Sequence, residues 1–361
     1  MATSFASYVR QMLYNLTQLP SSLITYFKNF YSWVFATAVD RSLESALFVT
    51  GTTAECRYRL DNSSSATISL PDGRKLGYAQ YGLQTGRAIL YLHGLPGSRI
   101  EIAFLDTVAM RLEARIIAVD RPGYGWSSPH PNRTILDHAK DVEHLAEQLE
   151  LDTYAVLGIS GGGPYALACA ASLPADKLKA VSIVCGLGSP DMGHRGMNWT
   201  HWLGFTLGWR YTPGLTRWWL GREAAARLDL TDEERLELLQ RQFSKTKSKA
   251  DPKDIAFFSD VDRMRLYLRS SREVYSQGFD GMAQDGKLLC MDFGFRIEDI
   301  RSNLPVQLWY GKRDTHVPLN HGEQIFARLG SRAHLRTEDE THASIVTNWE
   351  EQILEDLVNA M

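Results

Sequence analysis

Short apolar runs that alternate with helical segments are the feature of this sequence that most constrains its fold. Five such runs are rich in Val, Ile, Leu and Ala, and each ends at a Gly or Ser: residues 87–94, 114–123, 154–160, 179–186 and 305–311. Strands that are apolar on both faces are typical of a parallel sheet covered by helices on each side. The sequence therefore predicts an α/β fold with a mostly parallel central sheet and helices on both faces.

Further elements complete this pattern at both ends of the series. Residues 66–82 predict a β-hairpin that turns at the Pro-Asp-Gly sequence of residues 71–73, because tight turns prefer Pro and Gly. Apolar residues recur at helical spacing in 134–149 and 161–173, and residues 344–361 predict one closing amphipathic helix. Function in such sheets gathers in the loops at the carboxyl ends of the parallel strands, so we expect the site there.

Residues 187–300 interrupt the alternation of strands and helices. This stretch holds five of the nine tryptophans and several helical patterns, so we predict an inserted helical cap or lid. The five are Trp199, Trp202, Trp209, Trp218 and Trp219. The α/β core is then divided between residues 55–186 and 301–361, and we expect the lysine-rich stretch 245–253 to be a solvated loop.

The first 54 residues follow a different pattern from the rest of the chain. Apolar residues recur at helical spacing on both sides of Pro20, which predicts an N-terminal amphipathic helical arm over residues 1–54. Polar residues interrupt the apolar stretches, so the arm resembles neither a spanning helix nor an export signal, and we expect a cytoplasmic protein. We expect residues 1–40 to contact the folded body, a second copy in a homo-oligomer, or the surface of a membrane.

Charge and cysteine content exclude several classes of protein. The 39 basic and 42 acidic residues give a net charge of −3 without a dense basic block, so we expect no nucleic-acid partner. The four cysteines form no CxxC pair, and no histidine cluster has metal-ligand spacing. The cysteines are Cys56, Cys169, Cys185 and Cys290. We therefore expect reduced thiols, no metal site and no cofactor.

The strongest chemical signal is the sequence Gly-Ile-Ser-Gly-Gly at residues 158–162. A G-x-S-x-G pattern occurs easily by chance, but here it lies where an apolar strand ends and a helix begins. Such a turn exposes the hydroxyl of Ser160 above the sheet, and side chains at Gly158 or Gly162 would crowd the neighbouring backbone. The amide of Gly161, at the start of the helix, is suited to stabilise a negatively charged oxygen. These features predict a nucleophilic serine.

A serine hydroxyl becomes an effective nucleophile when a base accepts its proton and an acid orients that base. Asp314 follows the apolar run 305–311, and His342 lies between the last strand and the closing helix. The order Ser, Asp, His along the chain is that of one hydrolase architecture. Asp191, after the run 179–186, is the best alternative acid. The other candidate bases, which are less favoured by their position, are His316, His321 and His334.

Two further motifs make the pattern specific. Residues 93–98 read His-Gly-Leu-Pro-Gly-Ser, and residues 120–127 read Asp-Arg-Pro-Gly-Tyr-Gly-Trp-Ser. With the serine motif, Asp314 and His342, they resemble the landmarks of the α/β-hydrolase fold family with a helical cap, in the family's order, over residues 66–361.

The resemblance implies a role for each matching residue. Ser160 would be the nucleophile, His342 the general base and then the acid, and Asp314 the residue that orients the histidine. Related epoxide hydrolases and haloalkane dehalogenases carry an aspartate in place of the serine, which argues against both activities. Proline iminopeptidases usually have a tryptophan after the serine, where this chain has Gly161. The cap and the N-terminal arm are loosely similar to fungal α/β-hydrolases, some of them associated with secondary metabolism.

The resemblance also implies an oxyanion hole. The amides of Leu95 and Gly161 would form it, and Gly158 and Gly162 would support the turn. His93 would brace the loop that carries Leu95 and would not act as the base.

Together these features predict a serine hydrolase that cleaves an ester, thioester or related acyl bond of a fairly apolar small molecule through a Ser160 acyl-enzyme. The alternative is an acyltransferase, a C–C bond hydrolase or a lyase that uses the same residues, because a cap that excludes water favours such outcomes. A non-catalytic ligand receptor on the same fold is less favoured, since the catalytic residue types are complete. The sequence does not identify the natural substrate.

Overall fold

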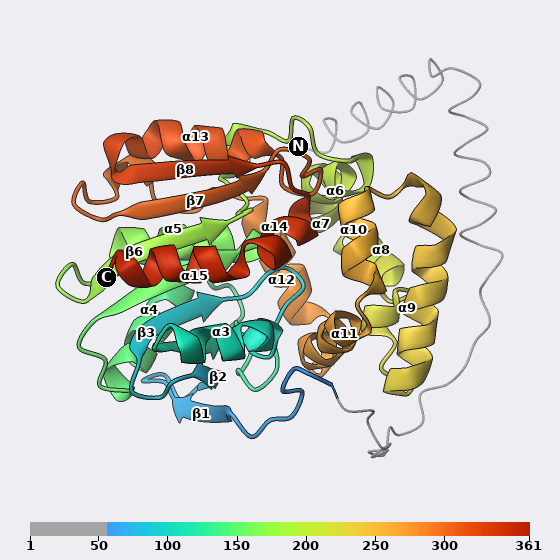
Figure 1. The fold of residues 1–361 in the computed structure, drawn as a ribbon, viewed down its shortest axis with the longest axis horizontal. Helices are drawn as coiled ribbons and strands as arrows, with labels where there is room; N and C mark the ends of the chain where they lie inside the picture. The colour runs from blue at the N-terminus through green and yellow to red at the C-terminus, as the bar shows by residue number, and fades with distance from the viewer. Residues whose placement is uncertain (1–55) are drawn as a thin grey trace, which may run out of the picture. The chain divides into compact units, whose positions relative to one another are not determined.

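The computed structural model describes residues 56–361, and the helical arm expected over residues 1–54 lies outside this part of the chain. The described residues belong to one compact unit built around an eight-stranded sheet (Figure 1). Its strands follow the order β1-β2-β4-β3-β5-β6-β7-β8. Their bounds are β1 Ser65–Ser69, β2 Lys75–Gly82, β3 Arg87–Leu92, β4 Ala114–Val119, β5 Tyr154–Ile159, β6 Leu178–Val184, β7 Val306–Gly311 and β8 Ala333–Glu338.

The sheet is mostly parallel, as the sequence predicts. Strands β3 to β8 run parallel to one another, and β2 pairs antiparallel with both β1 and β4. The predicted hairpin is β1 and β2. In its turn the amide of Gly73 donates to the carbonyl oxygen of Leu70 over 2.9 Å. Gly73 has a φ of 85°, which glycine adopts without steric cost.

The central strands are apolar on both sides, and each side packs against its own layer of helices (Figure 1). In β3, Leu90 and Leu92 belong to one core, while Ile89 and Tyr91 belong to the other, as the period of two in a strand requires. Helices α4, α5 and α13 pack into the first core, and α3, α14 and α15 pack into the second. Their bounds are α3 Asp106–Arg111, α4 Ile135–Gln148, α5 Gly163–Ser172, α13 Leu319–Leu329, α14 His342–Asn348 and α15 Glu350–Asn359.

Seven α-helices lie between β6 and β7 in the sequence and form a group beside the sheet (Figure 1). The expectation of a solvated loop at 245–253 is wrong, because α9, a 3-10 turn and α10 run through this stretch. A capping box between Thr231 and Glu234 fixes the start of α9, and Asp251 caps the start of α10. The seven helices are α6 Trp199–Leu203, α7 Trp209–Tyr211, α8 Pro213–Leu220, α9 Asp232–Thr246, α10 Pro252–Ser259, α11 Val261–Tyr275 and α12 Asp280–Leu289.

The single closing helix expected over residues 344–361 is in fact two helices, α14 and α15, which meet at Trp349. Trp349 has φ −123° and ψ 12°, outside the α-helical range. Its ring lies 5.9 Å from that of Trp309 and 4.5 Å from the guanidinium of Arg336. The helix is interrupted at Trp349 because the ring of this residue packs against side chains of β7 and β8.

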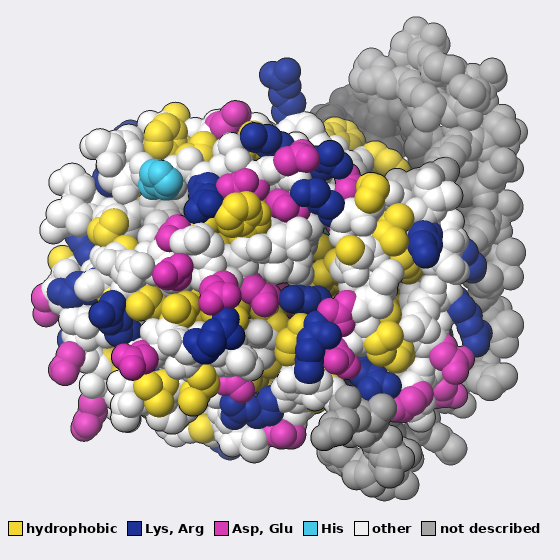
Figure 2. Space-filling view, viewed as in Figure 1, with side chains coloured by type: hydrophobic (Ala, Val, Ile, Leu, Met, Phe, Trp, Pro, Cys, Tyr) yellow, Lys and Arg dark blue, Asp and Glu magenta, His cyan; other side chains and the backbone are white. Residues whose placement is uncertain are grey.

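Basic and acidic side chains are interspersed over the face of the molecule seen in Figure 2. This mixture produces no single-sign field on that face that would steer a polyanion toward it. Within residues 56–361, no helix is both long enough and apolar enough to cross a membrane.

Candidate active site

Ser160 lies directly after β5, where the chain turns from the sheet toward α5. Its φ of 54° is in the left-handed region that residues other than glycine rarely adopt. The α-helix expected from residue 161 is preceded by a 3-10 turn, Ser160–Gly162. A β-carbon at Gly158 would lie 2.6 Å from the carbonyl oxygen of Gly162, and one at Gly162 would lie 2.1 Å from that of Leu92. The two glycines therefore allow the close approach of backbone that exposes the serine.

The structure brings Asp314 and His342 together with Ser160. The Nε2 atom of His342 lies 3.0 Å from Oγ of Ser160, and its Nδ1 atom lies 2.7 Å from Oδ2 of Asp314. The other carboxylate oxygen, Oδ1, accepts hydrogen bonds from the amides of His316 at 2.8 Å and Val317 at 2.9 Å. Because two backbone donors hold Oδ1, the carboxylate presents Oδ2 to the imidazole. The three side chains form one continuous hydrogen-bonded series.

His342 is the first residue of α14, and Thr341 is the cap of this helix. The Thr341 hydroxyl oxygen accepts the amide of Ser344 at 3.2 Å, and the Ser344 hydroxyl oxygen accepts the amide of Thr341 at 2.8 Å. The Thr341 hydroxyl also donates to Asp254 on α10 at 2.6 Å. This capping box fixes the backbone from which the imidazole projects.

The electrostatic surroundings of His342 favour its charged form. Burial opposes an imidazolium here, but the carboxylate of Asp314 outweighs burial and raises the pKa of His342 well above its ordinary value of 6.5. The Cys185 thiol, 3.9 Å from Nε2, stays neutral because burial raises its pKa. Burial also lowers the pKa of His316 to about 3 and that of His201 to about 4, so these two nearby rings are neutral. The charge that acts most directly on His342 is therefore that of Asp314.

We expect reaction at Ser160 to accelerate with rising pH, with a midpoint above 6.5. A base at position 342 must be neutral to accept the serine proton, so activity falls as acidification protonates it through its raised pKa. The measurement is kcat/KM for a soluble p-nitrophenyl ester over a range from about pH 5 to about pH 10. A midpoint below 6.5 would contradict an ionised Asp314 beside His342.

The alternative acid and two of the alternative bases lie away from the serine. Asp191 forms an ion pair on the surface, where its side chain is 62% exposed. His321 accepts a backbone amide at 3.1 Å, and His334 is exposed on β8. The exception is His316, whose ring centre lies 5.2 Å from that of His342. His316 therefore packs beside the series of three without replacing any member of it.

The two amides expected to form an oxyanion hole belong to loops that lie in contact beside Ser160. A β-carbon at Gly161 would lie 2.9 Å from the amide nitrogen of Leu95, and one at Gly94 would lie 3.7 Å from Cβ of Ser160. The loop after β3 is thus in contact with the turn after β5. The first amides of a helix have no acceptor within that helix, so the Gly161 amide is left to donate to a bound oxygen.

The peptide group between Gly94 and Leu95 is held by hydrogen bonds on its oxygen. The carbonyl oxygen of Gly94 accepts from Nδ1 of His93 at 2.9 Å and from Nη2 of Arg121 at 2.7 Å. The carbonyl and the amide of a trans peptide point in opposite directions, so these donors fix the direction of the Leu95 N–H. They also polarise the peptide, which makes that N–H a stronger donor. On the other side, Glu101 accepts the Gly94 amide at 2.9 Å.

His93 is fully buried and uses both of its ring nitrogens within this loop. Its Nε2 atom accepts the amide of Arg121 at 3.2 Å, while Nδ1 donates to the carbonyl oxygen of Gly94. Burial and the adjacent Arg121 charge lower the pKa of His93 well below its ordinary value, so the ring is neutral. The geometry suits the bracing role expected of His93, because no ring nitrogen remains for Ser160.

A buried carboxylate from the cap holds Arg121 in turn. Asp285, on α12, accepts hydrogen bonds from Arg121, Arg133 and Tyr165. The Asp285 carboxylate and both guanidinium groups have no exposed surface. Burial alone would raise the pKa of Asp285, but the two arginines outweigh it and lower that pKa to about 2. This ionic cluster connects helix α12 to the loop that carries Leu95.

We expect Asp285→Ala to lower the free energy of unfolding by about 3–5 kcal/mol, because it leaves two buried guanidinium groups without a counter-charge. The matched control is Asp280→Ala on the same helix. Asp280 is 97% exposed and lies 3.6 Å from Arg217, so its loss should cost about 1 kcal/mol or less. Urea unfolding followed by circular dichroism measures both changes. Equal losses would show that the buried cluster does not anchor the cap.

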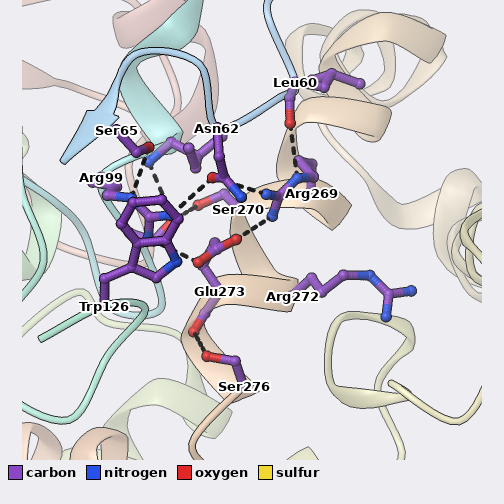
Figure 3. Close-up of polar contacts among 12 residues, drawn as sticks. Leu60, Asn62, Ser65, Arg99, Trp126, Arg269, Ser270, Arg272, Glu273 and Ser276 are labelled. Atoms are coloured by element: carbon purple, nitrogen blue, oxygen red, sulfur yellow. Dashed lines mark hydrogen bonds and ion pairs between the residues drawn. The ribbon is translucent and has the colours of Figure 1, made fainter. Parts of the chain in front are cut away.

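A second buried network joins α11 to the core (Figure 3). The Nη1 atom of Arg99 donates to Oδ2 of Asp120 and to Oε2 of Glu273, each at 2.8 Å. Glu273 also accepts a hydrogen bond from Arg269 at 2.6 Å, and the indole ring of Trp126 lies 4.2 Å from the Arg99 guanidinium. Because Glu273 and Arg269 both belong to α11, the cap is attached to the core at two buried ionic clusters.

Ser160 lies in the wall of a cavity of about 540 Å³ between the strand ends and the cap. This volume is typical of sites for small organic molecules. Most of the wall is apolar, and it includes Phe104, Phe205, Leu239, Phe257, Phe258 and Met264. The ionisable groups in the wall, apart from histidines, are Tyr91, Glu101, Glu223, Asp254, Arg263 and Tyr267. The site therefore favours an apolar ligand with a small number of polar groups.

Cys185, Asp314 and His342 form the one group of potential metal ligands among residues 56–361 whose ligand atoms all lie within 4.8 Å of one another. His342 already uses Nδ1 and Nε2 in its contacts with Asp314 and Ser160. Burial also keeps the Cys185 thiol protonated. The arrangement therefore fits a proton relay better than a metal centre.

Sequence reasoning missed the residues that connect the site to the cap. Arg121 belongs to the Asp-Arg-Pro-Gly motif, and that motif was the available signal for a fixed arginine. Asp285 carries no local signal, because its partners Arg121 and Arg133 lie 164 and 152 residues away along the chain. Glu101 and Glu273 also lie outside the motifs at residues 93–98, 120–127 and 158–162.

A mostly parallel sheet that carries a serine on a strained strand-to-helix turn is typical of hydrolases built on the α/β fold. A family model described as alpha/beta hydrolase fold matches residues 87–348 of this chain. The chain therefore belongs to the alpha/beta hydrolase fold family.

Curated relatives match over part of their length. The chain is 32% identical to a proline iminopeptidase from Arabidopsis thaliana over 117 residues, which are 31% of this chain and 30% of that protein. It is 28% identical to the sn-1-specific diacylglycerol lipase ABHD11 from Danio rerio over 145 residues, 39% of this chain and 46% of that protein. The chain thus matches less than half of the length of each relative.

Solved structures match over most of the chain. An esterase from Exiguobacterium antarcticum aligns with a TM-score of 0.56 at 17% identity, covering 81% of this chain and 98% of that one. The enol-lactonase from Burkholderia xenovorans LB400 aligns with a TM-score of 0.54 at 17% identity, covering 81% and 100%. At such identities, the likeness establishes the shared fold.

Proposed function

We propose that this chain is a serine hydrolase that cleaves an ester, thioester or related acyl bond of a fairly apolar small molecule through an acyl-enzyme on Ser160. The observation that carries the proposal is the hydrogen-bonded series from Asp314 through His342 to Ser160, with 3.0 Å between Nε2 and Oγ. This series lies at the wall of a largely apolar cavity. The partial similarity to a diacylglycerol lipase supports a substrate with an ester bond.

Acylation follows from this geometry. Oγ of Ser160 attacks the carbonyl carbon of the substrate while Nε2 of His342 accepts the hydroxyl proton. The carboxylate of Asp314 stabilises the resulting imidazolium. The carbonyl oxygen becomes negatively charged and accepts hydrogen bonds from the amides of Leu95 and Gly161. When the tetrahedral intermediate collapses, His342 returns the proton to the leaving oxygen or sulfur, and the acyl group stays on Ser160.

Deacylation repeats the same steps with water as the nucleophile. His342 accepts a proton from water, whose oxygen attacks the acyl carbon, and then returns a proton to Oγ of Ser160 as the acid leaves. The fixed peptide between Gly94 and Leu95 serves both half-reactions, because negative charge develops on the same carbonyl oxygen each time. This fixed donor requires no reorganisation as the charge develops.

Esters and thioesters are favoured over peptides for two reasons. The cavity wall is rich in phenylalanine and leucine side chains, which suit an acyl chain. The chain also has Gly161 where proline iminopeptidases usually carry a tryptophan. The 32% identity to such a peptidase extends over 117 residues, which are less than a third of either protein.

The proposal is tested with p-nitrophenyl esters of increasing chain length, the matching thioesters, and anilides of the same acids. We expect turnover of esters and thioesters and much weaker turnover of anilides. A second assay adds an alcohol as acceptor. Release of free acid alone would support hydrolysis, and formation of the new ester would support the acyltransferase alternative. Tight binding of an ester without turnover would favour a receptor instead.

A further inference from the structure

The helical stretch that contains α6 and α7 is apolar on its inner and outer sides. Residues 199–211 run through α6, a π-helical turn at Gly204–Gly208, and α7. On the inner side, His201 and Phe205 line the cavity and Trp209 is buried. The outer side exposes Trp199 (56%), Trp202 (47%), Leu203 (41%), Leu207 (49%) and Tyr211 (63%). A helix that is apolar all round normally has neighbours on all sides.

Helix α8 extends this exposed surface, because it contacts the π-helical turn and exposes 61% of Leu215. Within residues 56–361, six of the twelve large hydrophobic side chains that are exposed fall in the short segment 199–215. Such a concentration of exposed apolar side chains marks an interaction site. We name these six residues the outer cap face: Trp199, Trp202, Leu203, Leu207, Tyr211 and Leu215.

The segment that carries the outer cap face is basic. Residues 192–222 contain four arginines and no Asp, Glu or Lys, whereas the whole chain has a net charge of −3. Arg195 and Arg210 are exposed, and Arg217 is 58% exposed with Asp280 at 3.6 Å. The segment that carries the outer cap face therefore combines exposed aromatic rings with an excess of arginine over acidic residues.

We propose that the outer cap face binds the surface of a membrane that contains anionic lipid headgroups. Tryptophan and tyrosine favour the interface between water and lipid, and arginines beside them attract anionic headgroups. A symmetric contact between two copies would instead bring arginines of like charge together, which disfavours a second copy as the occupant. This contact lies on the cap and is distinct from the one expected for residues 1–40.

A single helical stretch separates the outer cap face from the cavity. The same helical stretch presents tryptophans outward and His201 and Phe205 into the cavity that contains Ser160. Binding of the outer cap face to a membrane would bring this cavity close to apolar acyl compounds in that membrane. This link to substrate supply rests on the proposed function. Vesicle binding is measured without turnover, so the docking proposal and the Ser160 proposal fail independently.

The test is sedimentation of the full chain with vesicles of phosphatidylcholine, with or without phosphatidylglycerol. We expect binding to the anionic vesicles and weak binding to the neutral ones. The double variant Trp199→Ser/Trp202→Ser should lower the partition coefficient by more than about tenfold. Arg195→Gln/Arg210→Gln should lower it by roughly tenfold or more. The matched control is Met110→Ser, which removes a side chain that is 51% exposed on α3 and should bind like the wild type.

Labelling of Ser160 with a fluorophosphonate checks that each variant is folded, because the substituted residues do not line the cavity. Failure of the wild type to bind either vesicle would overturn the proposal. Unchanged binding by both double variants would also overturn it and would assign the contact to another segment, such as residues 1–40. A wild-type dimer that both double variants convert to monomers would overturn it in favour of a second copy.

Discussion

Ser160→Ala is expected to lower kcat for an ester substrate by about 10⁶-fold, because it removes the hydroxyl that is hydrogen-bonded to His342. The Cys185 thiol also lies close to the base, 3.9 Å from Nε2 of His342. Burial raises the pKa of that thiol, so it stays protonated and unreactive. The same variant should lose covalent labelling by a fluorophosphonate. Single-turnover kinetics and mass spectrometry of the labelled protein measure the two effects.

The matched control for this variant is Ser189→Ala. Ser189 also lies in a loop after a central strand, but its hydroxyl donates to Asp191 at the surface and does not line the cavity. We expect Ser189→Ala to retain labelling and turnover. If Ser160→Ala were labelled to the same extent as the wild type, the nucleophile would be another residue and the proposed mechanism would be wrong.

Asp314→Asn is expected to lower kcat by roughly 10⁴-fold while leaving KM nearly unchanged. A carboxamide at this position no longer stabilises an imidazolium, and it no longer selects the tautomer of His342 that leaves Nε2 free to accept the serine proton. The two backbone donors from His316 and Val317 still hold the side chain in place, so the loss is one of charge and tautomer rather than of folding.

The pH profile separates this explanation from a simple structural defect. Burial lowers the pKa of His342 and the Asp314 carboxylate raises it, so removing the carboxylate should move the activity midpoint downward. The control is Asp191→Asn, which changes the competing acid candidate on the surface and should leave both rate and midpoint unaltered. An unchanged midpoint in Asp314→Asn would mean that another group sets the pKa of His342.

The location of the candidate site was predictable because its signals are local. Each apolar run that ends in Gly or Ser became a parallel strand followed by a loop, and parallel strands place those loops at one edge of the sheet. The glycines on either side of Ser160 could be interpreted without coordinates, since a β-carbon at Gly158 or Gly162 would clash with backbone. Asp314 and His342 followed from their positions after later strands, and the structure brings both to the serine.

Local patterns were least reliable where packing competes with them. The single helix expected over 344–361 is broken at Trp349, because its ring packs against Trp309 and Arg336 instead of continuing a helix. The lysine-rich stretch 245–253 is largely helical, because α9, which begins after the cap at Thr231, runs into it and the cap at Asp251 starts α10 within it. In both cases a cap or a packing partner that lies outside the segment contributes to the outcome.

The sequence by itself determined the α/β fold and the residue types at the site, because strand period, turn chemistry and the order of motifs act over short stretches of chain. Only the tertiary structure decided how the site is held. Asp285 and Glu273 come from cap helices and reach Arg121 and Arg99 across 164 and 174 residues of chain. The tertiary structure also decided that the apolar segment 199–215 faces both the cavity and the surface. Burial and ion pairing across such separations depend on which elements pack together, and that information is absent from any local window of the sequence.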